Sequence, residues 1–129
     1  DSLDRTPLIH ACMKNNEEII KYLVENGAYV NVEDNEGKTP VLYACFHNNE
    51  KIITYLVENG AGVNVNRKYH LHWTPLTYTL LNGSNEMIKY LVVHGANVNV
   101  KDNEGKTPLI HAILRNNTEI IKYLIDRGA

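Results

Sequence analysis

TPLIHACMKNNEEIIKYLVENGAYVNVEDNEGK, residues 6–38, is the stretch that decides the fold, because the chain repeats it. A second copy starts at Thr39, a third at Thr74 and a fourth at Thr107, and each copy opens with Thr-Pro. The starts are therefore 33, 35 and 33 residues apart. Self-similarity at this period predicts one small unit stacked along a line, not one globular core.

Each copy carries the signals of two short helices. Thr6 is a good N-cap, since its hydroxyl accepts from a backbone N–H of the first turn, and Pro7 suits the first helical position, where no N–H is needed. The first helix ends near Asn15, where the third copy has Gly83, and both residue types tolerate a left-handed backbone. A second capping residue then starts a helix with a buried apolar stripe, which a glycine ends. The second caps are Asn16, Asn49, Ser84 and Asn117, the first stripe is Ile19, Ile20, Leu23 and Val24, and the final glycines are Gly27, Gly60, Gly95 and Gly128.

A hairpin-like loop joins each copy to the next. In the first copy it alternates apolar and polar residues over 30–32 and turns at Asp34-Asn35-Glu36-Gly37, with glycine at the sharp point. The two helices of a copy are joined by so short a connection that they must be antiparallel neighbours. We therefore predict an all-α solenoid of seven or eight helices with no true sheet.

These motifs resemble the ankyrin repeat, in which Thr-Pro-Leu opens the first helix and Gly-Ala-x-Val-Asn precedes a β-turn. The resemblance covers the whole chain and implies an ankyrin-type α-solenoid of helix-turn-helix units joined by β-hairpin-like loops. We expect residues 1–129 to form a single ankyrin repeat domain with repeats of about 1–33, 34–66, 67–101 and 102–129. The matching residues are Thr6-Pro7-Leu8, Ala11, Gly27-Ala28, Val30-Asn31, Thr39-Pro40, Gly60-Ala61, Val63-Asn64, Thr74-Pro75-Leu76, Gly95-Ala96, Val98-Asn99, Thr107-Pro108-Leu109 and Gly128-Ala129.

The chain departs from the family pattern at one polar position. In the family, a histidine after Thr-Pro-Leu bonds the Thr hydroxyl and ties neighbouring repeats. That histidine is replaced by Ile9, Leu42, Thr77 and Ile110, and His10 and His111 stand one residue later. The resemblance also implies that Asn31, Asn64 and Asn99 are candidate hydroxylation targets, while their chemistry favours a hydrogen bond to the hairpin backbone.

Composition indicates an ordinary globular chain. Its 129 residues are 43% hydrophobic and carry a formal charge of −2, so we expect no general attraction to nucleic acid or to an anionic membrane. No apolar run approaches the roughly 18 residues of a membrane span, and we expect no signal peptide. Cys12 and Cys45 occupy the same position in successive repeats, on helices expected about 8–10 Å apart, which is too far for a disulfide. We predict two buried, reduced thiols in an intracellular, cytoplasmic protein.

Side chains that could carry catalysis are scattered along the chain. The glycines end helices or turn hairpins and form no phosphate-binding loop, and no motif supplies a base to a serine or cysteine. His70 and His72 alternate and would share one face of an extended segment, but two histidines are an incomplete ligand set. A metal pair, a solvated loop and a contact pair stay open as explanations of these two residues. We predict no enzyme activity, no cofactor and no resident metal.

The remaining function is binding. In stacked repeats the exposed binding surface is formed by the hairpin tips and the first helices. One position of the first helix is apolar in all four copies, and such a ladder indicates a binding groove. The alternative is that this position leans into the gap between helix and hairpin. The ladder is Met13, Phe46, Leu81 and Leu114, with His47 beside Phe46, and the bordering row is His10, Tyr43, Tyr78 and His111.

The loop between the second and third repeats differs from the others in chemistry and, we infer, carries a two-residue insertion. Asn66-Arg67-Lys68-Tyr69-His70-Leu71-His72-Trp73 replaces the acidic Asp-Asn-Glu-Gly-Lys tip of 34–38 and 102–106. Trp, Tyr and Arg are enriched at binding hot spots, so Trp73 either contacts a partner or packs on the first helix of the third repeat. A nucleic-acid base also suits Arg67 and Lys68 beside aromatics, but the slightly acidic chain disfavours it. The predicted partner-binding residues are Arg67, Lys68, Tyr69, His70, His72, Trp73, Met13, Tyr43, Phe46, His47, Tyr78, Leu81 and Leu114.

We predict a non-catalytic module for protein–protein interaction. The alternatives are a structural spacer or targeting arm of a larger multidomain protein, and the non-catalytic arm of an enzyme whose active domain lies elsewhere. Both ends keep the apolar pattern of the internal copies, whereas natural arrays end in polar capping repeats. We therefore expect an excerpt of a longer array, monomeric with weak self-association through its uncapped ends. The apolar end residues are Leu8, Ile9, Met13, Ile120, Ile121, Leu124 and Ile125.

Overall fold

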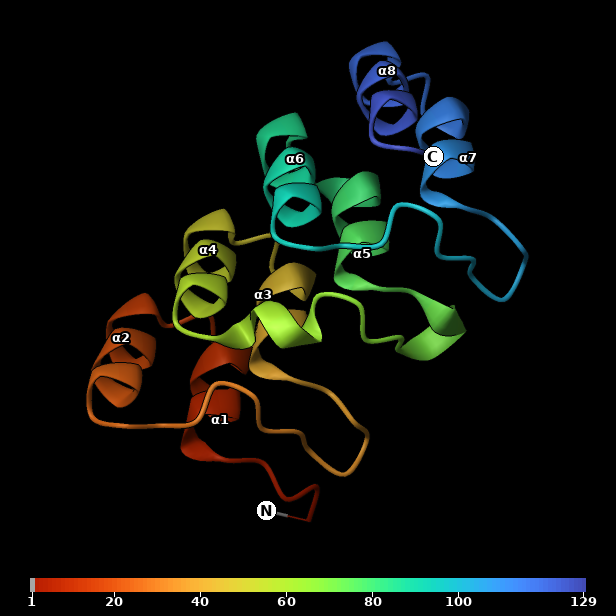
Figure 1. The fold of residues 1–129 in the computed structure, drawn as a ribbon. Coiled ribbons are helices and arrows are strands. Elements are labelled where there is room, and N and C mark those ends of the chain that lie inside the picture. Colours follow the sequence, from red (N-terminus) through yellow and green to blue (C-terminus); the bar gives the residue numbers. More distant parts are fainter. Residues whose placement is uncertain (1) are drawn as a thin grey trace. The chain divides into compact units, whose positions relative to one another are not determined.

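The computed structural model describes residues 2–129, apart from the side chains of residues 63 and 64. This part of the chain holds eight α-helices, two short 3-10 helices and no β-strand, which confirms the predicted all-α solenoid (Figure 1). In chain order they are α1 (Pro7–Met13), α2 (Glu17–Glu25), α3 (Pro40–Phe46), α4 (Glu50–Glu58), η1 (Ala61–Asn64), η2 (His70–His72), α5 (Pro75–Asn82), α6 (Asn85–Val93), α7 (Pro108–Leu114) and α8 (Thr118–Asp126).

The chain forms two compact units, Asp1–Asn64 and Val65–Ala129. Unit 1 holds α1 to α4 with η1, and unit 2 holds η2 with α5 to α8. Within unit 1, α1 packs against α2 and α3, and within unit 2, α5 packs in the same way against α6 and α7. Each unit is a stack of two repeats. That residues 1–129 act as a single domain stays a prediction.

The α-helices begin at the predicted caps. The Thr6 hydroxyl accepts from the Ile9 N–H at 3.3 Å, and the Asn16 amide oxygen accepts from the Ile19 N–H at 3.1 Å. Proline at the first helical position removes no hydrogen bond, because that N–H has no partner inside a helix. The remaining caps, formed in the same way, are Thr39, Asn49, Thr74, Ser84, Thr107 and Asn117.

The tight turn between paired helices is left-handed in three repeats and extended in the other. Asn15, Asn48 and Asn116 have φ of 56°, 52° and 56°, which asparagine adopts more readily than most residues. Gly83 stands at the same position with φ −91°, so the prediction of a left-handed glycine is wrong there. A Cβ at Gly83 would lie 2.4 Å from Cγ2 and 2.8 Å from the carbonyl oxygen of Thr79. This residue is glycine because of the space available, not because of its φ.

Part of each apolar stripe forms the core of its unit. Ile19 is 47% exposed, so the prediction that it belongs to a buried stripe is wrong, and Ile20 is the residue of that stripe that is fully buried. Ile20, Ile53 and Ile88 are at most 1% exposed. The leucine seven residues after the second capping residue is buried in three repeats, as Leu56, Leu91 and Leu124. Burial of one such side chain contributes about 1.5–3 kcal/mol, so local capping and stripe burial together specify each helix pair. The fully buried leucines are Leu8, Leu42, Leu56, Leu76, Leu91 and Leu124.

Both cysteines belong to this core. Cys12 and Cys45 are free thiols and buried, which confirms that they are core residues and not a disulfide. Burial raises the pKa of each thiol to about 12, because a thiolate would lose its hydration. Neither thiol is therefore a nucleophile at neutral pH.

Candidate functional site

Three hairpin tips share one backbone framework. The framework spans five residues, 34–38, 69–73 and 102–106: the N–H of the first donates to the carbonyl of the fifth, and the N–H of the fourth donates to the carbonyl of the first. We call residues 34–38 and 102–106 the acidic tips and residues 67–73 the basic tip. The two distances are 3.0 and 2.9 Å for 34–38, 2.8 and 2.9 Å for 69–73, and 3.0 and 3.0 Å for 102–106. The turn within the basic tip, residues 69–73, is therefore no longer than the acidic tips, and Arg67 and Lys68 precede it.

The two extra residues of the second repeat lie before the basic tip. The side-chain amide of Asn31 donates to the carbonyl of Gly60 at 3.1 Å. Asn66 makes the equivalent bond to Gly95 at 2.8 Å, and both asparagines stand eight residues before a Thr-Pro. The extra length therefore falls between Gly60 and Asn66, where η1 lies, and the prediction of an insertion within 66–73 is wrong. One turn of 3-10 helix absorbs the added residues.

These amides also settle the expected role of two motif asparagines. Asn31 and Asn99 donate to backbone carbonyls, as predicted, but the acceptor is a helix-end glycine of the following repeat and not the hairpin. The Asn99 bond to Gly128 is 3.3 Å long. The side chain of Asn64 lies outside the described residues.

The basic tip has side chains where the acidic tips need glycine. Gly37 and Gly105 have φ of 76° and 78° at the fourth tip position, whereas His72 stands there with φ 58° and follows Leu71 with φ 62°. A left-handed non-glycine residue costs about 1–2 kcal/mol. The Leu71 carbonyl accepts from the Asn103 N–H at 3.0 Å, so the neighbouring acidic tip helps to hold this conformation.

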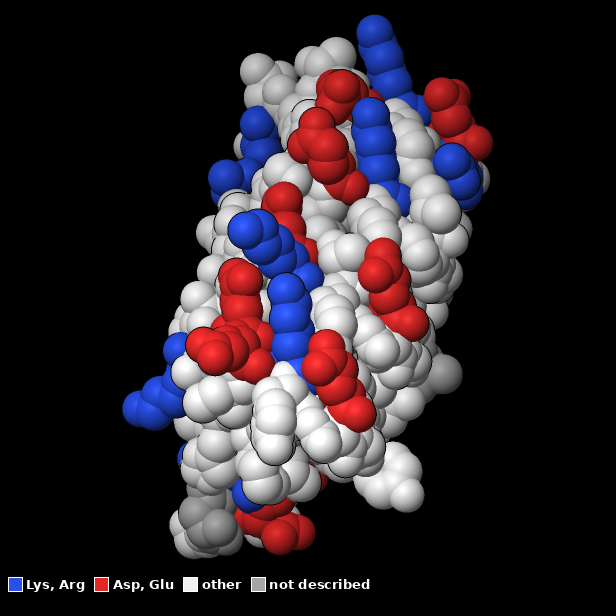
Figure 2. Space-filling view, turned by 90° about the vertical axis from the view of Figure 1, so that its left-hand side faces the viewer, with Lys and Arg blue, Asp and Glu red and all other residues white. Residues whose placement is uncertain are grey.

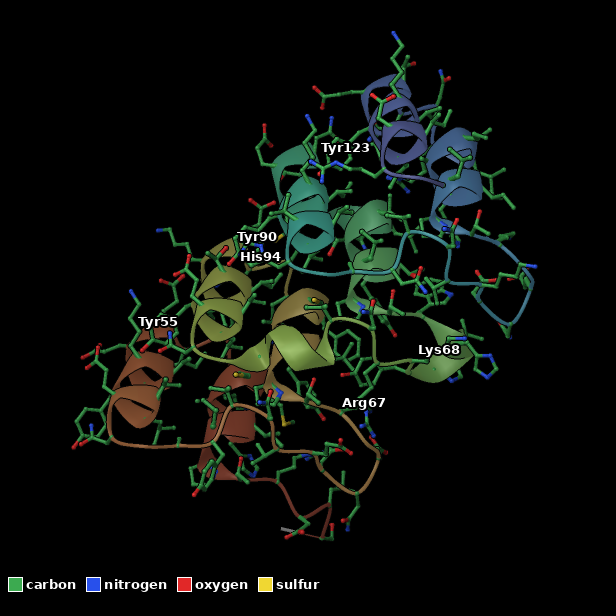
Figure 3. The ribbon with its side chains drawn as sticks, in the orientation of Figure 1. Tyr55, Arg67, Lys68, Tyr90, His94 and Tyr123 are labelled. Atoms are coloured by element: carbon green, nitrogen blue, oxygen red, sulfur yellow. The ribbon has the colours of Figure 1, made fainter. Side chains whose placement is uncertain are left out.

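The charged and histidine side chains of the basic tip face solvent. Arg67, Lys68, His70 and His72 are exposed, and Leu71 is 38% exposed. Figure 3 shows Arg67 and Lys68 on the segment that leads into η2. An exposed leucine between histidines and two cations is available for contact with another molecule.

Trp73 points inward from the same tip. It is half-buried, and its ring centroid lies 5.1 Å from that of Tyr78 on α5 and 6.3 Å from that of His111 on α7, both edge-on. Such aromatic pairs contribute about 0.5–1.5 kcal/mol beyond area burial. Packing on the first helix of the third repeat, one of the two predicted roles of Trp73, is present. Tyr69 is also half-buried.

In unit 1, a buried carboxylate joins the acidic tip to α3. Asp34 Oδ1 accepts from the N–H groups of Glu36 and Lys38 at 2.9 and 3.0 Å, and Oδ2 accepts from the Tyr43 hydroxyl at 2.7 Å. Arg5 Nε lies 3.7 Å from the same Oδ2. Burial alone would raise the pKa of Asp34, but these hydrogen bonds and the Lys38 charge lower it below its usual value. Burial and the Asp34 bond raise the pKa of Tyr43 to about 12.

In unit 2, the equivalent carboxylate meets a histidine. Asp102 Oδ1 accepts from the N–H groups of Glu104 and Lys106 at 2.9 Å each. His111 Nε2 lies 2.9 Å from Asp102 Oδ2, and because a carboxylate only accepts, Nε2 carries the hydrogen. Burial alone would raise the pKa of Asp102, but the bonds from Lys106, His111 and Glu104 lower it. Neither aspartate was identified from the sequence as a functional residue. The signal was present in the shared Asp-Asn-Glu-Gly-Lys motif, because an aspartate can accept a hydrogen bond from the backbone N–H two residues later in a turn.

The apolar ladder in unit 1 is only partly exposed. Phe46 is 45% exposed and Met13 is half-buried. The Phe46 ring meets Tyr43 edge-on at 5.8 Å, and Tyr43 is only 7% exposed, which leaves little of it for a partner. His47 Nε2–H donates to the Met13 carbonyl at 2.7 Å. His10, in the bordering row, is exposed.

The ladder in unit 2 alternates in the same way. Leu114 is 65% exposed, whereas Leu81 and Tyr78 are half-buried and His111 is 6% exposed. Both predicted arrangements therefore occur: the second ladder residue of each unit faces solvent, and the first leans inward. Sites in each unit are compatible with a partner, but the ladder is not one uniform exposed strip.

The second helices of both units carry charges of mixed sign. Figure 2 shows Lys and Arg side chains set between Asp and Glu side chains on the face it presents. In unit 2, Tyr90 stacks on His94 with ring centroids 4.0 Å apart, and Lys89 and Arg127 lie 5.5 and 5.0 Å from the Tyr123 ring centroid. Tyr90, His94 and Tyr123 are marked in Figure 3. Charges of mixed sign on these helices do not favour a phosphate backbone, which binds to clustered cations.

Neither a cluster of metal-ligating side chains nor a membrane-spanning helix is present in the described part of the chain. Within it, no three or more His, Cys, Asp or Glu side chains are grouped to hold a metal ion. His70 and His72 lie in η2, not in an extended segment as predicted. None of the helices described has the length and apolar character that crossing a bilayer requires.

Comparison with known proteins gives one family match. A family model described as ankyrin repeats (three copies) matches residues 1–68 and again residues 62–129, so the matches together span the whole chain. No curated protein sequence matches the chain.

Proposed function

Because this chain belongs to the ankyrin repeat family, whose repeats generally mediate protein–protein interaction, we propose that it is a non-catalytic module that binds a partner protein through its hairpin tips and first helices. The basic tip is the observation that carries this proposal. Its turn, residues 69–73, has the same backbone framework as the acidic tips but no carboxylate, and the exposed cations Arg67 and Lys68 directly precede it. A fold alone does not give function, so the proposal rests on this surface and not on the stacking.

Backbone strain supports a role for the side chains of this tip. Leu71 and His72 both adopt left-handed backbone conformations, and at the His72 position both acidic tips have glycine, which adopts this conformation at little cost. Strain of this kind concentrates at ligand-contacting positions, where the side chain serves a purpose other than stability. Leu71 supplies an apolar contact in the centre of the tip and the flanking cations supply a charged rim, which is the usual anatomy of an interface.

The sign of the charge selects the partner surface. The acidic tips expose Glu36 and Glu104, each paired with the lysine two residues later, so little of their charge is free. The basic tip contains no carboxylate within 67–73. We therefore expect an acidic area on the partner opposite Arg67 and Lys68, and association that weakens as salt is added.

The test exchanges charge without touching the packed Trp73. Arg67→Glu with Lys68→Glu should lower the affinity for a partner captured from cells about tenfold or more, by analogy with charged interface residues. Lys101→Glu with Lys106→Glu is the matched control, because it places the same charge change on an acidic tip. Equal affinities for both double variants would remove the basic tip from the binding site and favour the structural-spacer alternative.

Weak self-association is a second part of the proposal. Unit 1 exposes Ile19 by 47% and Tyr22 by 66%, and unit 2 exposes Ile113 by 55% and Ile125 by 54%. Apolar surface of this kind favours contact between copies. Sedimentation velocity at rising concentration should show a modest shift to larger species, which Ile113→Lys with Ile125→Lys abolishes. A concentration-independent monomer would contradict it.

A further inference from the structure

Unit 2 contains a cleft on the side of the turns that join paired helices. Its volume is about 580 Å³, and it lies between the α5–α6 turn and the α7–α8 turn. One wall includes Leu81, Asn82 and Gly83, and the other includes Arg115, Asn116 and Asn117. All of these residues belong to one compact unit, so the cleft does not depend on how the two units are placed.

The corresponding place in unit 1 is bridged. His47 Nε2–H donates to the Met13 carbonyl at 2.7 Å, so the two turns are joined at their helix ends. The Asn49 side-chain amide donates to Asn15 Oδ1 at 2.8 Å, which joins them a second time. These two hydrogen bonds link the neighbouring turns of unit 1 directly.

Two substitutions remove both bridges in unit 2. Gly83 stands where unit 1 has Asn15, and without a side chain it offers no amide oxygen. Asn117 therefore keeps only the bond to Asn85 Oδ1 at 2.8 Å, the counterpart of the 3.2 Å bond from Asn49 to Glu17 in unit 1. Arg115 stands where unit 1 has His47, and its side chain forms no hydrogen bond or ion pair with another described residue. The cleft is thus a consequence of the sequence of the third and fourth repeats.

The polar groups of the cleft suit an anion with two oxygens. Arg115 is exposed and free, and a guanidinium pairs with a carboxylate through two parallel hydrogen bonds. The side-chain amides of Asn82 and Asn116 also make no hydrogen bond with a described residue, so they add neutral donors. The nearby carboxylate of Glu119 is already engaged by Asn85 and lies 3.7 Å from Lys89 Nζ.

Size and lining restrict the ligand further. A volume of 580 Å³ is far above the ~30 Å³ share of a water molecule, so the cleft exceeds what a lone inorganic ion fills. It lies within the usual range of about 300–1,000 Å³ for ligand sites. No aromatic side chain lines it, so a nucleic-acid base would find no ring on which to stack. The exposed surface of the cleft is almost entirely polar.

We propose that this cleft binds a glutamate- or aspartate-bearing segment of a partner protein, with Arg115 pairing the carboxylate and Asn82 and Asn116 donating to it or to the adjacent peptide group. The inference rests on the proposed function, since it assigns a second contact and a chemical class to the same partner. The cleft and the basic tip both favour acidic groups, and both belong to unit 2.

The test uses a capped tetraglutamate peptide and the whole chain. Nuclear magnetic resonance should show the peptide shifting the side-chain N–H signals of Arg115, Asn82 and Asn116. Arg115→Ala should weaken binding about tenfold, as expected for loss of one charge-assisted pair at a solvent-accessible site. Arg115 is exposed, so the variant keeps its fold. Lys14→Ala is the matched control: it removes an exposed cation at the same helix end in unit 1, where the turns are bridged, and should leave the affinity unchanged.

Three results would overturn the proposal. One is equal binding by wild type and Arg115→Ala, and another is equal binding of capped tetraglutamine. Inorganic phosphate binding as tightly as the peptide would make the cleft a site for a free oxyanion and remove the peptide assignment. None of these outcomes changes the charge-exchange test at the basic tip, so failure of the cleft and failure of the partner-binding proposal are separate results.

Discussion

The two units bury an equivalent carboxylate against different side chains. Each must bury the carboxylate that holds an acidic tip, Asp34 in unit 1 and Asp102 in unit 2. Unit 1 uses the Tyr43 hydroxyl at 2.7 Å with Arg5 at 3.7 Å, whereas unit 2 uses His111 at 2.9 Å. The residue at the Arg5 position in unit 2 is Trp73, which packs on His111 instead of reaching the carboxylate.

The difference shows which part of the arrangement is required. The aspartate and its two backbone hydrogen bonds are the same in both units, while the partner on the first helix and the residue before Thr-Pro change together. A cation beside a tyrosine in unit 1 becomes an aromatic ring beside an imidazole in unit 2. The common requirement is therefore one donor for Oδ2 and one large side chain to cover it.

Removal of the shared carboxylate should have the largest effect. Asp102→Ala leaves the N–H groups of Glu104 and Lys106 and the His111 ring without their acceptor, at a cost of about 3 kcal/mol. Asp34→Ala should cost a similar amount in unit 1. Hydrogen exchange, read separately over residues of each unit, should show the loss in the mutated unit. A loss below about 1 kcal/mol in either unit would contradict the requirement for the carboxylate.

Truncation of the side chain that covers the carboxylate should destabilise unit 2 more than unit 1. Trp73→Ala removes a half-buried ring and its contacts with Tyr78 and His111, which should cost about 2 kcal/mol. Arg5→Ala should cost about 1 kcal/mol or less, because its ion pair is long and its side chain is partly exposed. Urea denaturation followed by unit-specific probes measures both. If Trp73→Ala also lowers partner affinity in the folded fraction, Trp73 contacts the partner as well as packing.

Acid should destabilise both units through the same groups. Because the pKa of Asp34 and of Asp102 is lowered on folding, the unfolded chain takes up protons first as pH falls. This part of the stability is complete above the unfolded value of about 3.9 and is lost as pH falls through the lower folded pKa. Asp34→Asn should flatten the acid decline of unit 1 only, and Asp102→Asn that of unit 2 only. A decline that persists unchanged in both variants would assign it to other carboxylates.

Replacing a left-handed residue of the basic tip by glycine should have the smallest effect, and it should stabilise the unit instead of destabilising it. His72→Gly puts glycine at the position held by Gly37 and Gly105, so it should stabilise unit 2 by about 0.5 kcal/mol after the entropy cost of glycine. Gly105→Ala, at φ 78°, should destabilise the same unit by about 1 kcal/mol. Thermal unfolding measures both. Destabilisation by His72→Gly would show that the His72 side chain makes a structural contact.

The amino-acid sequence by itself determined the repeat. Thr-Pro, the second capping residues and the helix-end glycines act within one turn of helix, so their spacing was enough to predict seven or eight helices, their order and the absence of a sheet. The buried thiols followed from the same spacing. Local interactions decide these features, and they are readable because each depends on neighbours in the chain.

Only the tertiary structure decided where each side chain of the surface goes. Asp34 and Tyr43 are nine residues apart in sequence, and His47 reaches Met13 across 34 residues, so neither contact follows from a local pattern. The place of the extra residues was misjudged because Val-Asn occurs twice in succession, at 63–64 and 65–66, and only the hydrogen bond from Asn66 to Gly95 identifies the second as the motif. The cleft beside Arg115 arises because Gly83 cannot donate or accept through a side chain it lacks, an absence that matters only when a neighbouring turn is packed against it.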